Sequence, residues 1–333
     1  MKKSKIVCLS CVALIVAFLV VVNVACGIYA RYIDAFLVPA HMDSATRAEG
    51  KELAFNIEEE GIVLTENRDN VLPLSRSETR VNVFGWSATQ WVRSGDGSGR
   101  SGNSRSSIRY DLLSALEYRN IQYNENIISR YRWFRSSDRE FTNSLSSANE
   151  EFSRLYEPSI HDTDVFRAAD LAQAKEFSDV ALVVLGRVAG ESCDSPKVQY
   201  KQTERNGDIV TDDSRTYLDI SAEEEELLTY VGENYDKVIV IVNSTNVMNL
   251  GFMDSIEGLD ACLIVCGTGA YGALAILNTL YGVTESPSGR TPDTYVYDFK
   301  SSPAYATAGA EGLGAYTNAG GFYPTTVTCF YGR

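Results

Sequence analysis

Glu191 is the acidic side chain in this sequence whose position best suits acid–base chemistry. It lies in residues 186–194, a glycine-containing segment that directly follows an apolar run typical of a buried strand. A carboxyl group at the carboxyl end of a strand can reach into a crevice between loops and transfer a proton. Cleavage of a glycosidic bond needs such a group, because a carboxylic acid must protonate the leaving oxygen. Position alone favours a plainer explanation, an exposed loop acid or the ion-pair partner of Arg187.

Three further polar or glycine-rich segments come after other apolar runs. If the runs form a parallel sheet, all four segments lie beside one another, because parallel strands end at one edge. Ligands bind at that edge in open α/β sheets, so the sequence predicts a binding crevice lined by four loops. These segments are residues 94–102, 186–194, 243–246 and 267–272.

The glycine-rich segment at residues 97–102 matches the dinucleotide-binding pattern GxGxxG in its letters. That fingerprint places its first glycine at the end of a strand, where the pyrophosphate meets a helix N-terminus. Here about ten residues separate Phe84, which ends the preceding apolar run, from the first glycine. We therefore expect a flexible loop and no cofactor. The nucleophile pattern GxSxG is absent as well, because Asp96, Ser98 and Arg100 occupy that frame.

The composition of the 333 residues, 44% hydrophobic and 22% charged, describes a chain able to bury a large core. Its formal charge of -14 would repel a phosphate backbone, so nucleic acid is not an expected partner. The only two histidines, His41 and His161, weaken the case for a Ser-His-Asp hydrolase or a His-rich metal site. Cys8 and Cys11 have CxxC spacing but lie within the N-terminal apolar run, and the cysteines of the remaining chain, Cys193, Cys262, Cys266 and Cys329, include no CxxC pair. In one extended run Cys262 and Cys266 would lie roughly 13 Å apart, beyond disulfide reach, so we expect neither zinc nor a disulfide framework.

Beyond residue 44 the chain alternates apolar runs rich in β-formers with helical patterns. Runs that are apolar along their whole length indicate strands covered on both faces, as in a parallel sheet. The sequence therefore predicts an α/β fold, with a mainly parallel sheet between two helical layers. Ser221 and Glu224 form a capping box that marks one helix start. The predicted strands are residues 81–84, 121–123 (a weaker pattern), 180–185, 238–242 and 259–265, and the predicted helices are residues 44–60, 107–118, 164–177 and 222–235.

An uncharged apolar run from Ile6 to Ile28 precedes this domain. As a helix it would rise about 34 Å, enough to cross the hydrocarbon core of a bilayer. Lys2, Lys3 and Lys5 lie before it, so the positive-inside rule predicts a single-pass anchor in the cell membrane with residues 31–333 outside. The alternative is a cleaved signal peptide, although its apolar core usually spans only about 7 to 15 residues.

Seven short segments, taken in order, resemble the C-terminal sandwich domain of glycoside hydrolase family 3, the β-glucosidase family. Each segment is weak alone, but their shared order between residues 45 and 300 is fairly specific. In many members of that family a Gly-Glu loop carries the catalytic acid/base, and Glu191 is the matching position. The resemblance implies an αβα sandwich, a β-linked oligosaccharide or glycoside as substrate, and a Gly/Ser loop that shapes the pocket. The segments are GIVLTEN at 61–67, LPL at 72–74, VNVFG at 81–85, the loop around Gly97, DVALVVLG at 179–186, GE at 190–191 and PSGRTP at 287–292.

Two parts of the family pattern have no match in this sequence. The family's nucleophile is an aspartate in a separate (β/α)8 barrel, within a Ser-Asp-Trp-like segment, whereas Ser178-Asp-Val and Ser137-Asp-Arg lack the tryptophan. The family's Gly-Gln-Glu-Gly-Gly-like turn is replaced by residues 269–273. We therefore expect the barrel to come from a separate or downstream chain. The expected divisions are an anchor at residues 1–30, a tether at 31–44, a sandwich domain at 45–310, and a tail at 311–333 whose lack of a domain-ending pattern suits a truncated chain.

The resulting hypothesis is a membrane-anchored part of an exo-acting β-glycosidase that contributes its acid/base group. Glu191 would be the acid/base, and Arg187 and Asp194 would hold its loop. The expected substrate-binding residues are Arg187, Asp194, Asp96 and Ser98, with no metal and no cofactor. The alternative is a non-catalytic module outside the membrane that binds a glycan or a partner protein, and the absence of a second catalytic carboxylate favours it.

Overall fold

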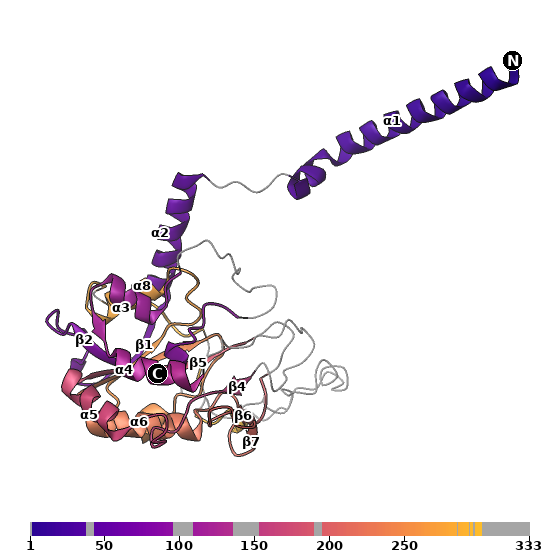
Figure 1. Ribbon diagram of the computed structural model, residues 1–333. Coiled ribbons are helices and arrows are strands. Elements are labelled where there is room, and N and C mark those ends of the chain that lie inside the picture. Colours follow the sequence, from indigo (N-terminus) through magenta and orange to yellow (C-terminus); the bar gives the residue numbers. More distant parts are fainter. Residues whose placement is uncertain are drawn as a thin grey trace. The chain divides into compact units, whose positions relative to one another are not determined.

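The computed structural model divides the chain into two compact units, Met1–Lys51 and Glu52–Arg333 (Figure 1). The first unit contains a long apolar helix, and the second contains the sheet and the helices that cover it. The structure describes residues 2–37, 43–95, 109–135, 153–189, 195–284, 286–292, 294–295 and 297–301.

Helix α1 of the first unit extends over Lys2–Leu37. Its segment Val7–Tyr32 is long and apolar enough to cross a membrane, and none of that segment is buried against protein. Length and composition of this kind suit a membrane span, and also a signal sequence near an N-terminus. The helix continues to Leu37, so part of the tether expected at residues 31–44 is helical.

Helix α2 spans Ser44–Gly61, in agreement with the predicted helix at residues 44–60. Asp43 precedes it, and one carboxylate oxygen of Asp43 accepts a hydrogen bond from the Thr46 amide at 2.8 Å. This contact satisfies one of the amides that have no partner inside a helix at its N-terminus. The Thr46 amide is also the main cause that lowers the pKa of the Asp43 carboxyl group.

Within the described residues, six strands of the second unit form one mixed sheet in the order β1-β9-β8-β5-β2-β3. Neighbouring strands are parallel except at one edge, where β1 runs antiparallel to β9. The mainly parallel sheet and all five predicted strand positions are confirmed. The strands are β1 Val63–Asn67, β2 Arg80–Phe84, β3 Gln122–Tyr123, β5 Val180–Arg187, β8 Lys237–Ser244 and β9 Ala261–Ile264.

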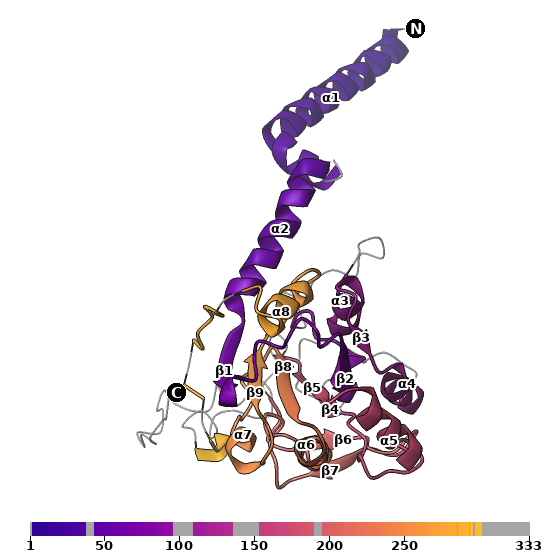
Figure 2. The same cartoon turned by 90° about the vertical axis from the view of Figure 1, so that its left-hand side faces the viewer.

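Helices cover both faces of this sheet, which confirms the predicted α/β sandwich (Figure 2). Helices α3 and α8 lie on one face, and α4, α5, α6 and α7 pack on the other. Successive residues of β5 belong to different cores. Leu182 packs in the core beneath α3 and α8, and Val183 packs in the core on the opposite face of the sheet. Burial of a side chain of this size contributes about 1.5 to 3 kcal/mol to the free energy of folding, and β5 and β8 are buried along nearly their whole length. The helices are α3 Leu112–Tyr118, α4 Glu125–Phe134, α5 Ala168–Phe177, α6 Ala222–Asn234, α7 Phe252–Ser255 and α8 Ala273–Leu280.

Smaller elements complete the second unit. Strands β4, β6 and β7 form a separate three-stranded sheet. Two helices start later than predicted: α3 begins after Asp111, whose side chain caps it together with Ser114, and α5 begins after the turn that ends near Arg167. The bounds are β4 Arg154–Leu155, β6 Gln199–Lys201, β7 Val210–Asp212, and the 3-10 turns Arg68–Asn70, Trp86–Ala88 and Phe299–Ser301.

Candidate active site

The carboxyl ends of β2, β5, β8 and β9 meet at one edge of the sheet, because these four strands are parallel. We call this edge the rim. The loops that start there are the four glycine-rich or polar segments identified in the sequence. Ligands of open α/β sheets bind at this edge, so the rim is the candidate site.

Asn243, the second-last residue of β8, joins two of the rim loops. Its side chain is fully buried, and its Oδ1 accepts a hydrogen bond from the Val92 amide at 2.6 Å. Its Nδ2 donates to the carbonyl oxygens of Val92, at 2.8 Å, and Cys266, at 2.6 Å. The indole of Trp91 donates to the Thr268 hydroxyl at 2.8 Å. The loops after β2 and β9 are therefore tied to each other as well as to the sheet.

The loops after β2 and β5 also touch at the rim. A Cβ atom placed on Gly95 would lie 2.9 Å from the carbonyl oxygen of Ala189. Ala189 in turn donates its amide to the Thr245 hydroxyl oxygen at 2.7 Å. These contacts bring together described residues of three of the predicted segments, residues 94–102, 186–194 and 243–246.

Arg187, the last residue of β5, is fully buried and has a different partner from the one considered in the sequence. Both terminal nitrogens of its guanidinium donate to the Glu224 carboxylate, at 2.8 and 2.6 Å. Its remaining donors bond the carbonyl oxygens of Tyr217, Gly186 and Asp219. Burial would lower the pKa of Arg187, but the Glu224 carboxylate outweighs it and raises that pKa. All five N–H groups of Arg187 donate to protein acceptors, which suits the expected role of holding its loop, whereas substrate binding by Arg187 stays a prediction.

Glu224 performs two tasks, because it also belongs to the predicted capping box of α6. Its Oε2 accepts the Ser221 amide at 2.8 Å, while the Ser221 hydroxyl accepts the Glu224 amide at 3.1 Å. The capping box is confirmed. One carboxylate thus fixes both the start of α6 and the end of β5.

A second buried carboxyl group, Glu157, holds the start of the loop after β2. Its Oε2 accepts the Trp86 amide at 2.6 Å, and its Oε1 lies 2.9 Å from the Tyr131 hydroxyl. The same hydroxyl accepts the Gly85 amide at 3.0 Å. Burial raises the pKa of Glu157 to about 8. Gly85 has φ of 94°, and a Cβ there would lie 2.3 Å from the Val184 carbonyl oxygen, so only glycine fits this turn.

The remaining predicted site residues, Glu191, Asp194, Asp96 and Ser98, lie outside the described residues. The structure describes the positions from which their loops depart, Ala189 and Gly95, and places those side by side. Sequence reasoning missed Asn243, Thr245 and Glu157 as parts of the site. The polar segment at residues 243–246 was a signal for the first two, whereas Glu157 is not marked by any local pattern.

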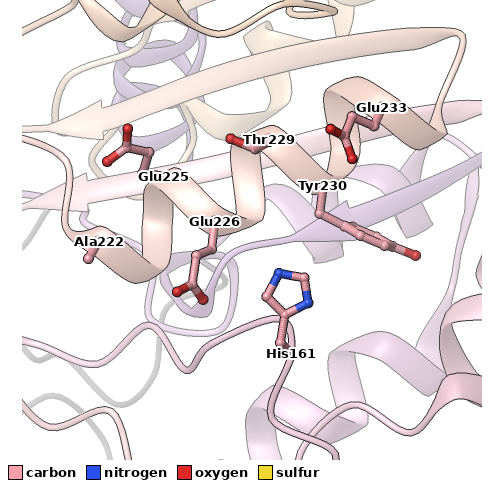
Figure 3. Close-up of a pocket in the computed structure, with 7 residues that line it drawn as sticks. All are labelled: His161, Ala222, Glu225, Glu226, Thr229, Tyr230 and Glu233. Carbon is pink, nitrogen blue, oxygen red and sulfur yellow. The ribbon is translucent and has the colours of Figure 1, made fainter.

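A separate hollow of about 340 Å³ lies along α6 (Figure 3). Figure 3 shows His161 facing the helix, with Glu226 and Tyr230 on the side toward it. Glu226 accepts a hydrogen bond from the Ser159 hydroxyl, and Glu225 pairs with Arg215. Within the part of the chain that the structure describes, no group of three or more His, Cys, Asp or Glu side chains is arranged to hold a metal ion. The hollow shares no lining residue with the rim loops.

The chain matches a known protein family. The family model described as "Glycosyl hydrolase family 3 C-terminal domain" matches residues 62–327. The chain therefore belongs to this family.

Individual relatives of the chain are β-glucosidases. It is 28% identical over 255 residues to the "Beta-glucosidase" of Ruminococcus albus, covering 76% of this chain and 24% of the relative. It is 27% identical over 257 residues to "Beta-glucosidase A" of Butyrivibrio fibrisolvens, covering 74% and 28%. Among solved structures, a β-glucosidase from Paenibacillus barengoltzii superposes with a TM-score of 0.61 at 27% identity, covering 77% of this chain and 25% of that one. The chain spans about a quarter of the length of these relatives.

Proposed function

We propose that this chain contributes the acid/base carboxyl group, Glu191, to a site that hydrolyses β-glucosides. The observation that carries the proposal is the position of Ala189 at the rim, directly beside Gly95. Glu191 follows Ala189 by two residues in the sequence, and Asp96 and Ser98 follow Gly95. The β-glucosidase relatives support the substrate class.

The chemistry needs two carboxyl groups. In the first step Glu191 protonates the glycosidic oxygen as the bond to the sugar breaks, while a second carboxylate attacks the anomeric carbon and forms a glycosyl-enzyme. In the second step the Glu191 carboxylate takes a proton from water, which then releases the sugar. We propose that the second carboxylate belongs to a (β/α)8 barrel, as the family resemblance implies. Asp96, Ser98 and Asp194 are the proposed contacts to the sugar.

Helix α1 bears on where the protein is located in the cell. We propose that it anchors the chain in the cell membrane by a single pass and that the second unit lies outside the cell. The apolar segment Val7–Tyr32 and the three preceding lysines support this orientation. Protease added to intact cells should then degrade the second unit. Survival of that unit until the cells are lysed would contradict the orientation.

A reconstitution experiment tests the catalytic proposal. The full chain in detergent should hydrolyse aryl β-glucosides very slowly or not at all, and addition of a separately expressed family 3 barrel domain should restore turnover. Glu191→Gln should then remove most of the restored rate, by about 10²- to 10⁴-fold for poor leaving groups. The loss should be smaller for activated leaving groups, because these need no proton.

The matched control is Glu233→Gln, which changes an exposed carboxyl group on α6 away from the rim. It should leave the restored rate unchanged. Turnover that is insensitive to Glu191→Gln would refute the assignment. Binding of a β-glucoside or a partner protein without any turnover would instead support a non-catalytic module.

A further inference from the structure

We propose that Thr245 is the positioning residue for the loop that carries Glu191, an inference that rests on the proposed function. Thr245 directly follows the last residue of β8. The pairing of β5 with β8 ends at Arg187 and Ser244. Beyond that pairing Thr245 makes one backbone hydrogen bond and one side-chain hydrogen bond to the end of β5 and the chain that follows it.

Two hydrogen bonds carry this extension. The Thr245 amide donates to the Arg187 carbonyl oxygen at 3.0 Å, and the Thr245 hydroxyl oxygen accepts the Ala189 amide at 2.7 Å. Arg187 itself is held by Glu224. The backbone is therefore fixed at Arg187 and again two residues later, at Ala189.

The methyl group of Thr245 faces a different loop from its hydroxyl group. A Cβ on Gly267 would lie 3.0 Å from this methyl carbon, so the loop after β9 runs close against it. The same Gly267 position is 3.2 Å from the Arg93 carbonyl oxygen in the loop after β2. Thr245 thus holds one rim loop by a hydrogen bond while its methyl group contacts another.

This arrangement matters for proton transfer, because an acid/base group must be held within about 0.5 Å of its productive position. Displacement by about 1 Å can cost about 10²-fold in rate. Ala189 precedes Glu191 by two residues and follows the end of the β5 pairing at Arg187, so its hydrogen bond to Thr245 fixes the backbone close to Glu191. Valine has the shape of threonine without the acceptor oxygen, whereas serine keeps the oxygen and loses only the methyl group.

The first experiment measures hydrogen exchange of the full chain in detergent, without any turnover. Thr245→Val should increase exchange in the peptide that contains Ala189, while peptides from β5 and α6 stay protected. Thr245→Ser should restore the protection at Ala189. Thr229→Val, on the exposed side of α6, is the matched control and should change nothing. Unchanged protection of Ala189 in Thr245→Val would overturn the inference.

The second experiment uses the reconstituted mixture of full chain and barrel domain. Thr245→Val should lower turnover of poor leaving groups by about 10- to 100-fold, with a smaller effect on activated ones and little change in KM, and Thr245→Ser should recover most of it. A large effect of Glu191→Gln together with none of Thr245→Val would overturn the positioning role alone. Turnover insensitive to Glu191→Gln would instead overturn the proposed function, and absence of any turnover in the wild-type mixture would overturn both.

Discussion

Glu224 and Glu157 are two buried carboxyl groups that hold neighbouring parts of the rim by different means. Their exposed fractions are nearly equal, 4% and 5%. Glu224 faces the guanidinium of Arg187 with both oxygens. The described donors to Glu157 are neutral, the Tyr131 hydroxyl and the Trp86 amide.

The two carboxyl groups are buried to nearly the same degree but differ in the charge of their partners, so we expect them to respond differently to pH. Burial raises the pKa of Glu157 to about 8, and the nearby Glu224 carboxylate adds to that rise. The Glu224 carboxylate meanwhile raises the pKa of Arg187. The Glu224 site should therefore depend on an intact ion pair, while the Glu157 site should depend on a proton.

Arg187→Met should produce the largest effect, because it leaves the Glu224 carboxylate buried without its cation. The free energy of unfolding should fall by about 3 to 5 kcal/mol. Urea unfolding, followed by the fluorescence of the buried Trp86 and Trp91, measures it. The double variant Arg187→Met/Glu224→Leu removes both charges and should recover most of the loss. Equal losses in the single and double variants would show that the buried, unpaired Glu224 charge is not the cause of the loss.

Glu157→Gln should change the pH dependence of stability. The folded-state pKa of about 8 lies above the ordinary value of 4.5, so the folded chain binds this proton more tightly than the unfolded chain does. Its contribution is fully present below about pH 4.5 and is lost as the pH rises through about 8. The slope is at most about 1.4 kcal/mol per pH unit.

Glutamine cannot ionise, so Glu157→Gln should make stability flatter between pH 5 and pH 8. The measurement is urea unfolding at several pH values in that range. Glu225→Gln, which changes an exposed acid on α6, serves as the control and should keep the wild-type slope. An unchanged slope in Glu157→Gln would mean that Glu157 is already ionised at neutral pH.

Tyr131→Phe tests how much the neutral Tyr131 hydroxyl contributes to the stability of the Glu157 site. The substitution removes the acceptor of the Gly85 amide and one partner of Glu157, while the ring stays in place. A buried amide left without its partner should cost about 1 to 3 kcal/mol in the free energy of unfolding. Tyr118→Phe, at a hydroxyl-bearing ring that is 61% exposed, should change stability little. Equal effects of the two variants would assign the loss to something other than the buried hydrogen bonds.

Glu225→Gln gives the smallest expected effect and tests whether an ion pair matters only when buried. Glu225 pairs with Arg215, but its side chain is 48% exposed. Screening by solvent should limit the loss to less than about 1 kcal/mol, and added salt should reduce it further. A loss of stability as large as that of Arg187→Met would show that an exposed ion pair can matter as much as the buried one.

The sheet could be predicted from the sequence because its central strands are apolar along their whole length. Residues 180–185 and 238–242 have that pattern, and they form the buried β5 and β8. Strand β1 was missed as a strand because it lies at the edge, where all five residues are only half-buried and Thr65, Glu66 and Asn67 are polar. An edge strand lacks the continuous apolar pattern that reveals a central one.

The contacts at the rim could not be predicted, because their partners are far apart in the sequence. Sequence proximity suggests Glu191 as an ion-pair partner of Arg187, whereas the carboxylate that pairs with Arg187 belongs to Glu224, 37 residues away. Glu157 is 71 residues from Trp86, and neither position has a distinctive pattern. Local spacing predicted the capping box of Ser221 and Glu224, but only the packing of α6 against β5 brings that carboxylate to a buried arginine.

The anchoring of the rim at Asn243 and Thr245 also bears on how such a domain can diversify. Both residues hold neighbouring loops at positions before their central segments, at Val92 and Ala189. Exchange of residues 96–108 or 190–194 between homologues would therefore leave these anchors and the sheet chemically unchanged. The residues that specify folding and those proposed to specify the sugar lie in different stretches of the gene. Natural selection or protein engineering could therefore alter the sugar that is recognised without changing the sheet and its anchors.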